Sequence, residues 1–240
     1  PHKRPPASEH CDQARPAIVR RVPESDAGQS EACLTAEPDL NCPLCPRLVA
    51  YRAANAAAEP AWHNAPVLSF GPENARLLIV GLAPGRGGAN KTGRPFTGDY
   101  AGDLLYATLL KFGFAKGEYR ADPNDGLKLV DCMITNAVRC VPPENKPTPA
   151  EAANCRPFLI NRIGALPKVK AMVALGRVAH EATIRATGGA LAKYPFGHGA
   201  QHILPNGMQL FDSFHCSRYN TNTGRLTAEM FEDVFAAVRK

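Results

Sequence analysis

The 240-residue sequence lacks several features that would assign it to large classes of protein. No stretch reaches the ~18 apolar residues that a membrane helix needs, so we expect no membrane partner. The first residues carry no apolar run of the kind found in a secretory signal peptide. Eight cysteines in a chain this long do not indicate a disulfide framework, because disulfide-dense domains are usually small. We therefore expect a reducing, cytoplasmic compartment, in which the cysteines are thiols or metal ligands.

The glycine-rich segment 81–99 lacks the spacings of common nucleotide-binding loops. Its sequence, G-L-A-P-G-R-G-G-A-N-K-T-G-R-P-F-T-G-D, contains neither G-x-G-x-x-G nor a lysine in G-K-[ST]. Its glycines still allow a backbone to approach a ligand closely. Arg86, Lys91 and Arg94 give the segment positive charge. Phe96 offers a ring for stacking on a planar ligand, although most phenylalanines pack in a core.

Charge is distributed unevenly along the chain, whose formal net charge is +6. Residues 1–40 hold five Lys or Arg and seven Asp or Glu, so residues 41–240 carry +8. A basic folded region favours a polyanionic partner, of which nucleic acid is the commonest, and a mildly basic solvated surface is the simpler alternative. Hydrophobic residues make up 45% of the chain, which is enough for a substantial core.

The order of the expected elements predicts a three-layer α/β/α sandwich with a four-stranded parallel sheet. Residues 1–38 show no sustained periodicity and are predicted to be a loosely ordered extension, with the folded domain spanning 39–240. Nearly continuous apolar runs predict buried parallel strands. We expect strands at 76–81, 129–136, 171–175 and 208–214, and helices at 46–58, 100–112, 148–163, 177–187 and 228–239.

Three polar or flexible positions follow these strands at their carboxyl ends, where α/β sheets form their sites. Gly81 opens the first loop, and Asn136 ends the second strand with an amide that both donates and accepts. His215 begins H-C-S-R-Y-N-T-N-T-G-R-L-T. Asn136 and His215 each have a structural alternative, because Asn is common in turns and a lone His is usually structural. Asp99 also has a structural alternative, because Asp is a favoured N-cap residue and a helix is expected to follow it.

Four cysteines have a spacing that suggests a metal centre. Cys42 and Cys45 form C-P-L-C, and Cys140 and Cys155 bracket a proline-rich segment. Four thiolates hold either an iron–sulfur cluster or a tetrahedral zinc ion, and the spacing alone leaves both open. Cys132 lies inside an expected strand and is predicted to be a core residue. The remaining cysteines, Cys11, Cys33 and Cys216, are predicted to have no ligand role.

Together these motifs resemble the uracil-DNA glycosylase superfamily, most closely its family 5. The resemblance rests on three segments in the same order: G-L-A-P-G…T-G-R-P-F-T-G-D, I-T-N-A-V-R-C-V-P-P-E-N-K-P and H-C-S-x-x-N-x-x-T-G-R-L-T. It covers the chain from about Cys42 to the C-terminus. A DNA-crosslinking branch of the superfamily has an extra basic loop containing His, and we find no such insertion after Gly98.

The resemblance implies a base excision repair enzyme that carries one structural [4Fe–4S] cluster on Cys42, Cys45, Cys140 and Cys155. Such an enzyme flips uracil out of DNA and hydrolyses its N-glycosidic bond, which leaves an abasic site. Family 5 enzymes also accept hypoxanthine and ethenocytosine. The implied protein is a nucleoid-associated monomer in the cytoplasm, whose partner is DNA containing uracil or other damaged bases.

The first motif departs from the pattern of related families. Leu82 stands where related cluster enzymes have Glu, and Ala83 stands where other families have a water-activating Asp or Asn. In family 5 the aspartate that matches Asp99 is the candidate replacement. Cys216 and Arg218 occupy positions where many members have proline.

The resemblance and the residues together assign three groups of roles. Asp99 and His215 are predicted to be catalytic. The flipped base is predicted to contact Gly81, Leu82, Phe96 and Asn136, and the DNA to contact Arg86, Lys91, Arg94, Ser217, Arg218 and Tyr219. The alternatives are a non-cleaving module with a four-cysteine metal site that binds damaged bases or nucleic acid, and a zinc-bearing nucleotide-binding protein.

Overall fold

The computed structural model describes residues 35–239, which belong to one compact unit spanning residues 34–240. Cys11, Cys33 and most of the predicted extension lie outside the described residues. Within 35–38, Glu37 accepts hydrogen bonds from the Ser69 backbone N–H and from Arg139. Residues just before position 39, the predicted start of the folded domain, therefore already contact that domain.

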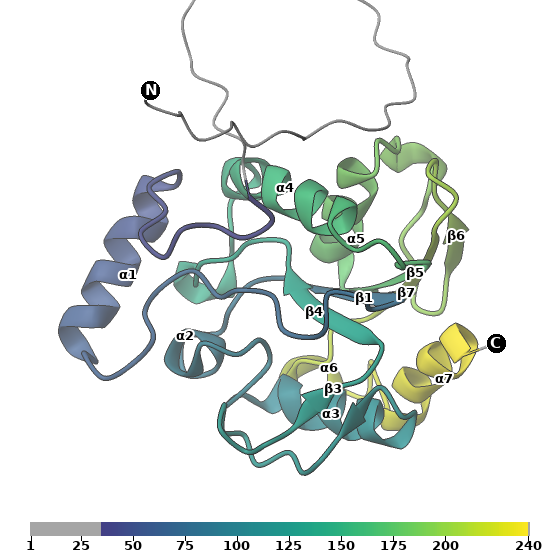
Figure 1. Ribbon diagram of the computed structural model, residues 1–240, viewed down its shortest axis with the longest axis horizontal. Coiled ribbons are helices and arrows are strands. Elements are labelled where there is room, and N and C mark those ends of the chain that lie inside the picture. Colours follow the sequence, from purple (N-terminus) through teal and green to yellow (C-terminus); the bar gives the residue numbers. More distant parts are fainter. Residues whose placement is uncertain (1–34, 240) are drawn as a thin grey trace, which may run out of the picture. The chain divides into compact units, whose positions relative to one another are not determined.

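The predicted parallel strands are confirmed, and they form the centre of one sheet (Figure 1). The sheet has five strands in the order β4-β1-β5-β7-β6. Its parallel members are β1 (Leu77–Gly81), β4 (Cys132–Asn136), β5 (Ala171–Leu175) and β7 (Gln209–Ser213). The register pairs Gly81 with Asn136, so two of the predicted site positions are neighbours at the same edge.

The four predicted parallel strands are joined by a fifth strand that the sequence did not predict, the short antiparallel edge strand β6 (Gln201–Ile203). Its three residues, Q-H-I, give no apolar run, and its outer side faces no further strand. A separate two-stranded ribbon pairs β2 (Ala115–Lys116) with β3 (Lys128–Leu129).

Alternating side chains of the strands form two cores, one on each face of the sheet. Leu77 and Ile79 of β1 point into one core, whereas Leu78 and Val80 point into the other. The first core includes side chains of α3 (Tyr100–Lys111) and α7 (Ala228–Arg239). The second includes side chains of α4 (Pro149–Gly164) and α5 (Arg177–Ala186). These helices complete the predicted three layers, as Figure 1 shows.

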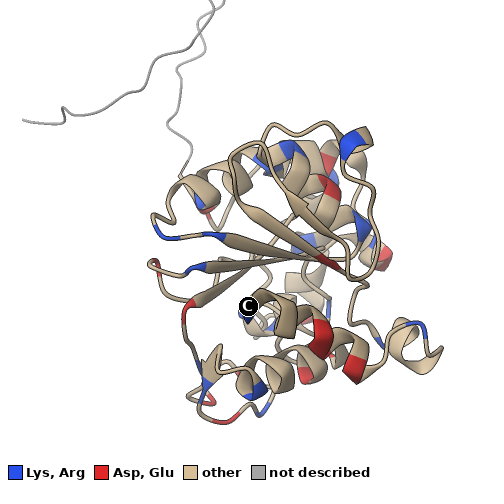
Figure 2. Cartoon of the chain, turned by 90° about the vertical axis from the view of Figure 1, so that its right-hand side faces the viewer, with Lys and Arg blue, Asp and Glu red and all other residues tan. Residues whose placement is uncertain are grey.

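The remaining helices are short or lie at the margin of the sandwich. Helix α1 (Pro46–Ala58) begins directly after Cys45, and α2 (Ala89–Thr92) interrupts the glycine-rich segment. Helix α6 (Arg218–Asn222) follows the loop after β7, and the 3-10 turns are η1 (Pro143–Asn145) and η2 (Leu191–Lys193). Figure 2 shows the sheet between the helix layers, with most charged residues on the helices and loops. Within residues 35–239, none of the helices has the length and apolarity needed to cross a membrane.

Candidate functional site

A pocket of about 880 Å³ opens beside the carboxyl ends of β1, β4 and β7. Its wall combines the glycine-rich loop after β1, the end of β4, the start of α3 and the loop after β7. The predicted residues that line it are Leu82, Arg86, Phe96, Asp99, Asn136, His215, Ser217 and Arg218. Segments far apart in the sequence thus meet where the parallel strands end, as expected for a doubly covered sheet.

Asn136 presents a buried amide at the floor of the pocket. Its side chain is 3% exposed, and its Oδ1 has no hydrogen-bond partner among the described residues. A buried polar atom without a partner is costly, so such an atom in a pocket points to a ligand that supplies the hydrogen bond. Gly81 is required next to it, because a Cβ there would collide with Asn136 Oδ1 and lie 2.6 Å from Phe96 Cζ.

Phe96 has a strained backbone, and its ring lines the pocket. Its φ is +53°, a left-handed conformation that is uncommon for bulky residues and that clusters at functional sites. Helix α3 packs against its carbonyl so closely that a side chain at Gly102 would overlap the Phe96 oxygen. That carbonyl also accepts a hydrogen bond from Tyr119 Oη at 3.2 Å.

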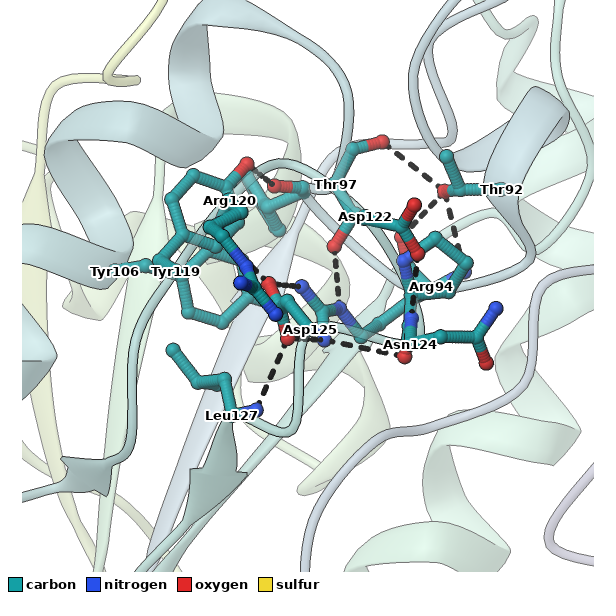
Figure 3. A network of polar contacts seen from close by, with 12 residues as sticks. Thr92, Arg94, Thr97, Tyr106, Tyr119, Arg120, Asp122, Asn124, Asp125 and Leu127 are labelled. Carbon is teal, nitrogen blue, oxygen red and sulfur yellow. Dashed lines mark hydrogen bonds and ion pairs between the residues drawn. The ribbon is translucent and has the colours of Figure 1, made fainter.

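The strained segment is held by a buried network centred on Arg94 (Figure 3). Arg94 donates to both oxygens of Asp125, at 2.7 and 2.8 Å, and its Nε donates to Thr97 Oγ1 at 2.7 Å. Its guanidinium also lies over the rings of Tyr106 and Tyr119. Arg94 is 5% exposed, so the prediction that it binds DNA was wrong. Its charge is already paired inside the protein, where no phosphate reaches it.

Asp99 takes the helix-capping position that was its structural alternative, and it also lines the pocket. It is the N-cap of α3, where Oδ1 accepts from the Gly102 N–H at 3.2 Å. Its Oδ2 lies against the glycine-rich turn, because a Cβ at Gly88 would overlap it and one at Gly85 would lie 3.1 Å away. Burial raises the pKa of Asp99 above its ordinary value, and the nearby charge of Asp103 adds to the rise. One carboxylate oxygen therefore caps the helix, and the other faces the glycine loop.

His215 lies on the opposite wall, with its ring stacked near Phe96 at a centroid distance of 6.0 Å. Among the described residues, no group hydrogen bonds its imidazole. Burial alone lowers the pKa of His215 to about 4. The imidazole is therefore neutral at neutral pH, and it offers a ligand one N–H donor and one lone pair.

The predicted DNA-contacting residues other than Arg94 are accessible. Arg86 and Lys91 are exposed, and both lie over the ring of Trp62, at 5.2 and 5.7 Å from its centroid. Arg218 lies over Tyr100, and Tyr219 is 72% exposed at the start of α6. Ser217 is the N-cap of this helix and accepts from the Asn220 N–H. These side chains surround the glycine loop and the pocket mouth.

Several pocket residues were missed at the level of sequence. They are Tyr100, Asp103, Ala121 and Asn145. Asp103 lies one helical turn after Asp99, and this i, i+4 spacing was a usable signal. Ala121 and Asn145 have left-handed φ values of +57° and +56°, and no pattern in the sequence predicts this backbone conformation.

The four predicted ligand cysteines converge beside α1. Cys45, Cys140 and Cys155 belong to one buried cluster, and Cys42 is half-buried next to it. Polar donors already face these thiols: Arg52 Nη1 lies 3.5 Å from Cys140 Sγ, and Asn154 Nδ2 lies 3.6 Å from Cys45 Sγ. Cys132 is buried in β4 and Cys216 is buried after β7, and both belong to the core on the side of α3 and α7 rather than to the cysteine cluster.

Four thiols are the ligand set of either a tetrahedral zinc ion or an iron–sulfur cluster. The four cysteines therefore fit a metal centre of either kind, and the metal content of the protein distinguishes the two.

Comparison with known proteins identifies the family of this chain. The family model described as the uracil DNA glycosylase superfamily matches residues 68–239. The chain belongs to this superfamily. It is 46% identical to the type-5 uracil-DNA glycosylase of Thermus thermophilus, over 83% of this chain and 93% of that protein. It is 38% identical to the type-5 enzyme of Pyrobaculum aerophilum, over 81% and 86% of the two chains.

The predicted resemblance to family 5 is therefore confirmed. Among solved structures, SMUG2 of Pedobacter heparinus matches with a TM-score of 0.44 and 14% identity, over 69% of this chain and 76% of that one. That likeness is too distant for a residue-level comparison. Membership of the superfamily accords with the α/β fold.

The first prediction concerns the electrostatics of the pocket. Replacing Phe96 with Ala should admit water beside the imidazole of His215 and raise its pKa from about 4 toward the ordinary 6.5, because burial is the sole cause of the depression. A pH titration of the His215 ring resonances by NMR measures this change. The exposed variant Tyr219→Ala should leave the value near 4. A wild-type His215 that titrates near 6.5 would contradict the geometry described here.

Proposed function

We propose that this protein hydrolyses the N-glycosidic bond of uracil in DNA, releasing the base and leaving an abasic site. The observation that carries the proposal is the buried, unpaired Oδ1 of Asn136 in a pocket, beside the ring of Phe96, whose backbone is strained. A flipped base supplies the two features that this arrangement lacks, a polar edge for the amide and a flat face for the ring. The curated relatives named uracil-DNA glycosylases support the same assignment.

Asn136 selects the base through its hydrogen-bonding edge. In the orientation that the structure shows, its Oδ1 accepts from a donor such as an N–H, and its Nδ2 donates to an acceptor such as a carbonyl oxygen. Uracil offers an N–H next to a carbonyl on its Watson–Crick edge. Cytosine has a ring acceptor and an exocyclic amine in those places, so it would leave the buried amide unsatisfied, at a cost of about 1–3 kcal/mol.

The size of the pocket supports a broader set of substrates. A volume of about 880 Å³ lies in the upper part of the range for small-molecule sites and leaves room beyond a pyrimidine ring. Hypoxanthine also places an N–H beside a carbonyl, so it satisfies Asn136 in the same way. We include hypoxanthine on this ground, and we include ethenocytosine and related damaged bases because of the resemblance to family 5, although ethenocytosine offers no N–H to Asn136 Oδ1.

Hydrolysis develops positive charge on the sugar and negative charge on the departing base. Asp99 offers a carboxylate oxygen beside the glycine loop to hold a water and to stabilise the cationic sugar. His215 and the backbone near Gly81 and Leu82 support the leaving base by hydrogen bonding, with His215 acting as a neutral donor. One well-aimed donor contributes about 2.7–4 kcal/mol in comparable sites.

Exposed cations and an exposed ring hold the DNA around the pocket. Arg86 and Lys91 on the glycine loop and Arg218 on α6 provide charge for phosphates, and Ser217 adds a hydroxyl. Tyr219, on the exposed side of α6, fills the gap left in the base stack by the flipped nucleotide. The charge of +8 on residues 41–240 supports a DNA partner.

The convergent cysteines support a [4Fe–4S] cluster as the resident cofactor. The ligands would be Cys42, Cys45, Cys140 and Cys155. The bound cluster would cross-link the segments that carry these cysteines, and it would take no part in the reaction at the pocket. It would tie the start of α1 to α4 and to the segment after β4. Six free cysteines among residues 35–239 suit the reducing cytoplasm proposed for the protein.

The second prediction separates catalysis from binding. Asp99→Ala should lower the single-turnover rate of uracil release about 10²–10³-fold, because the carboxylate acts on the reacting atoms. Affinity for the same duplex should change little. Alkaline cleavage of a uracil-containing duplex measures product formation, because only an abasic site breaks, and fluorescence anisotropy measures binding.

The matched control is Asp122→Ala, which removes an exposed carboxylate outside the pocket. A wild-type cleavage rate in folded Asp99→Ala would leave Asp99 with its helix-capping role alone. Tight binding of damaged DNA by the wild-type protein without any abasic product would instead identify a non-cleaving module and overturn the proposed reaction.

The third prediction tests the cofactor. Cys140→Ser should reduce the iron content of the purified protein, since it removes one of four proposed ligands. Cys132→Ser, also buried but part of β4, should keep full iron content. Elemental analysis and visible absorbance report the result. Full iron retention in Cys140→Ser, or zinc in place of iron in the wild-type protein, would contradict the assignment.

A further inference from the structure

A second polar group lies away from the pocket, on the face of the sheet that α5 covers. Asp212 of β7 has a completely buried side chain, and two histidines contact its carboxylate. His180 Nδ1 of α5 lies 2.8 Å from Oδ1, and His202 Nε2 of β6 lies 3.3 Å from Oδ2. Among residues 35–239, no lysine or arginine forms an ion pair with Asp212. A buried carboxylate without a cationic partner is costly, and a bound cation would offset that cost.

Both ring nitrogens of His180 contact oxygen atoms. Its Nε2 lies 2.9 Å from the carbonyl oxygen of Tyr194, which only accepts hydrogen bonds. Its Nδ1 lies 2.8 Å from Oδ1 of Asp212. With its N–H donated to the Tyr194 carbonyl, a neutral imidazole turns the lone pair of Nδ1 toward the carboxyl group. A metal ion beside Nδ1 would be bound by that lone pair.

The arrangement matches that of a metal-binding histidine. Such histidines usually donate one ring N–H to a backbone carbonyl, which fixes the tautomer and turns the other nitrogen toward the metal. The Tyr194 carbonyl has that relation to His180. A metal ion would use the contacts of both histidines with the two carboxylate oxygens at once.

We propose that His180, His202 and Asp212 form a binding site for a divalent zinc ion. Their ligand atoms all lie within 4.8 Å of one another, and the contacts of 2.8 and 3.3 Å are near the ~3.3 Å edge of a tetrahedron around zinc. Two imidazoles and one carboxylate suit zinc, whereas calcium and magnesium prefer oxygen ligands. Water would complete the coordination.

The site has a structural role, because its ligands come from three elements. It would clamp the edge strand β6 and helix α5 onto β7 at one point. Strand β6 has three residues, and its only partner in the sheet is β7. The rings of Tyr194 and Phe196 surround the histidines, so the ion would lie in a mainly aromatic shell. The role is independent of the proposed reaction.

Metal titration of the full-length protein tests the site. The protein is purified anaerobically with its iron content recorded, treated with a chelator, and titrated with cobalt(II) and then with zinc(II). Cobalt on nitrogen and oxygen ligands gives weak visible bands, whereas cobalt on thiolates adds an intense near-ultraviolet band, so the two sites are distinguished. We expect one equivalent of cobalt without the thiolate band, displaced by zinc.

Matched histidine variants assign the binding. His202→Gln keeps a hydrogen-bonding side chain on the edge strand and should weaken zinc binding by about tenfold or more. His198→Gln changes a histidine that instead accepts from the Phe214 N–H, and it should bind zinc as the wild type does. Circular dichroism checks that each variant is folded.

Absence of metal uptake by the wild-type protein would overturn the proposal, as would equal affinity in wild type and His202→Gln. A His180 ring that carries two protons in zinc-supplied protein, detected by ¹⁵N NMR, would also overturn it. A proton would then be the cation beside Asp212.

Discussion

The buried ion pair between Arg94 and Asp125 fixes the segment on which the site depends. Arg94 forms a two-pronged contact with a carboxylate that is fully buried, and the rings of Tyr106 and Tyr119 pack over the guanidinium. The two tyrosine hydroxyls donate to the carbonyls of Pro95 and Phe96. Removing one member of a buried pair costs about 3–5 kcal/mol, more than a strained residue such as Phe96 costs in most cases. The network can therefore hold the left-handed backbone that aims Phe96 into the pocket.

The ion pair between Arg94 and Asp125 exists only while the Asp125 carboxyl group is ionised. Hydrogen bonds from Arg94 hold the pKa of Asp125 well below its ordinary value, so the pair is intact at neutral pH. Its contribution to stability is present above the ordinary carboxyl pKa of about 3.9 and is lost as the pH falls further. In contrast, burial raises the pKa of Asp99. Asp125 and Asp99 both contact the glycine-rich segment, and their surroundings shift their pKa values in opposite directions. A lowered pKa suits an ion pair, whereas a raised carboxyl pKa is typical of functional sites.

Sequence patterns predicted much of this fold because its strands are short, apolar and buried on both faces. The same patterns brought Asn136 and His215 to the strand ends, since parallel strands end at one edge. They did not identify the partner of Arg94, because Asp125 lies 31 residues further along the chain, after helix α3. An arginine in a glycine-rich loop is typical of a phosphate contact, and only the folded chain shows that this one is paired.

Other features were also beyond the reach of sequence. Strand β6 has no apolar run, and its identity rests on pairing with β7. The group of His180, His202 and Asp212 comes from three elements with no shared spacing, so only their packing brings them together. The convergence of the four cysteines was predicted from their spacing, whereas that spacing does not choose between zinc and an iron cluster.

The kinetics of an Asp125 variant test the central claim most directly. The measurement is the single-turnover rate of uracil release by Asp125→Asn, below its unfolding temperature and with circular dichroism confirming the fold. Asp131→Asn is the control, because it breaks a partly exposed pair with Arg76 far from the loop. If the buried pair orders Phe96 and Asp99, the rate should fall about tenfold or more in Asp125→Asn and stay near wild type in the control. A wild-type rate from folded Asp125→Asn would contradict this account.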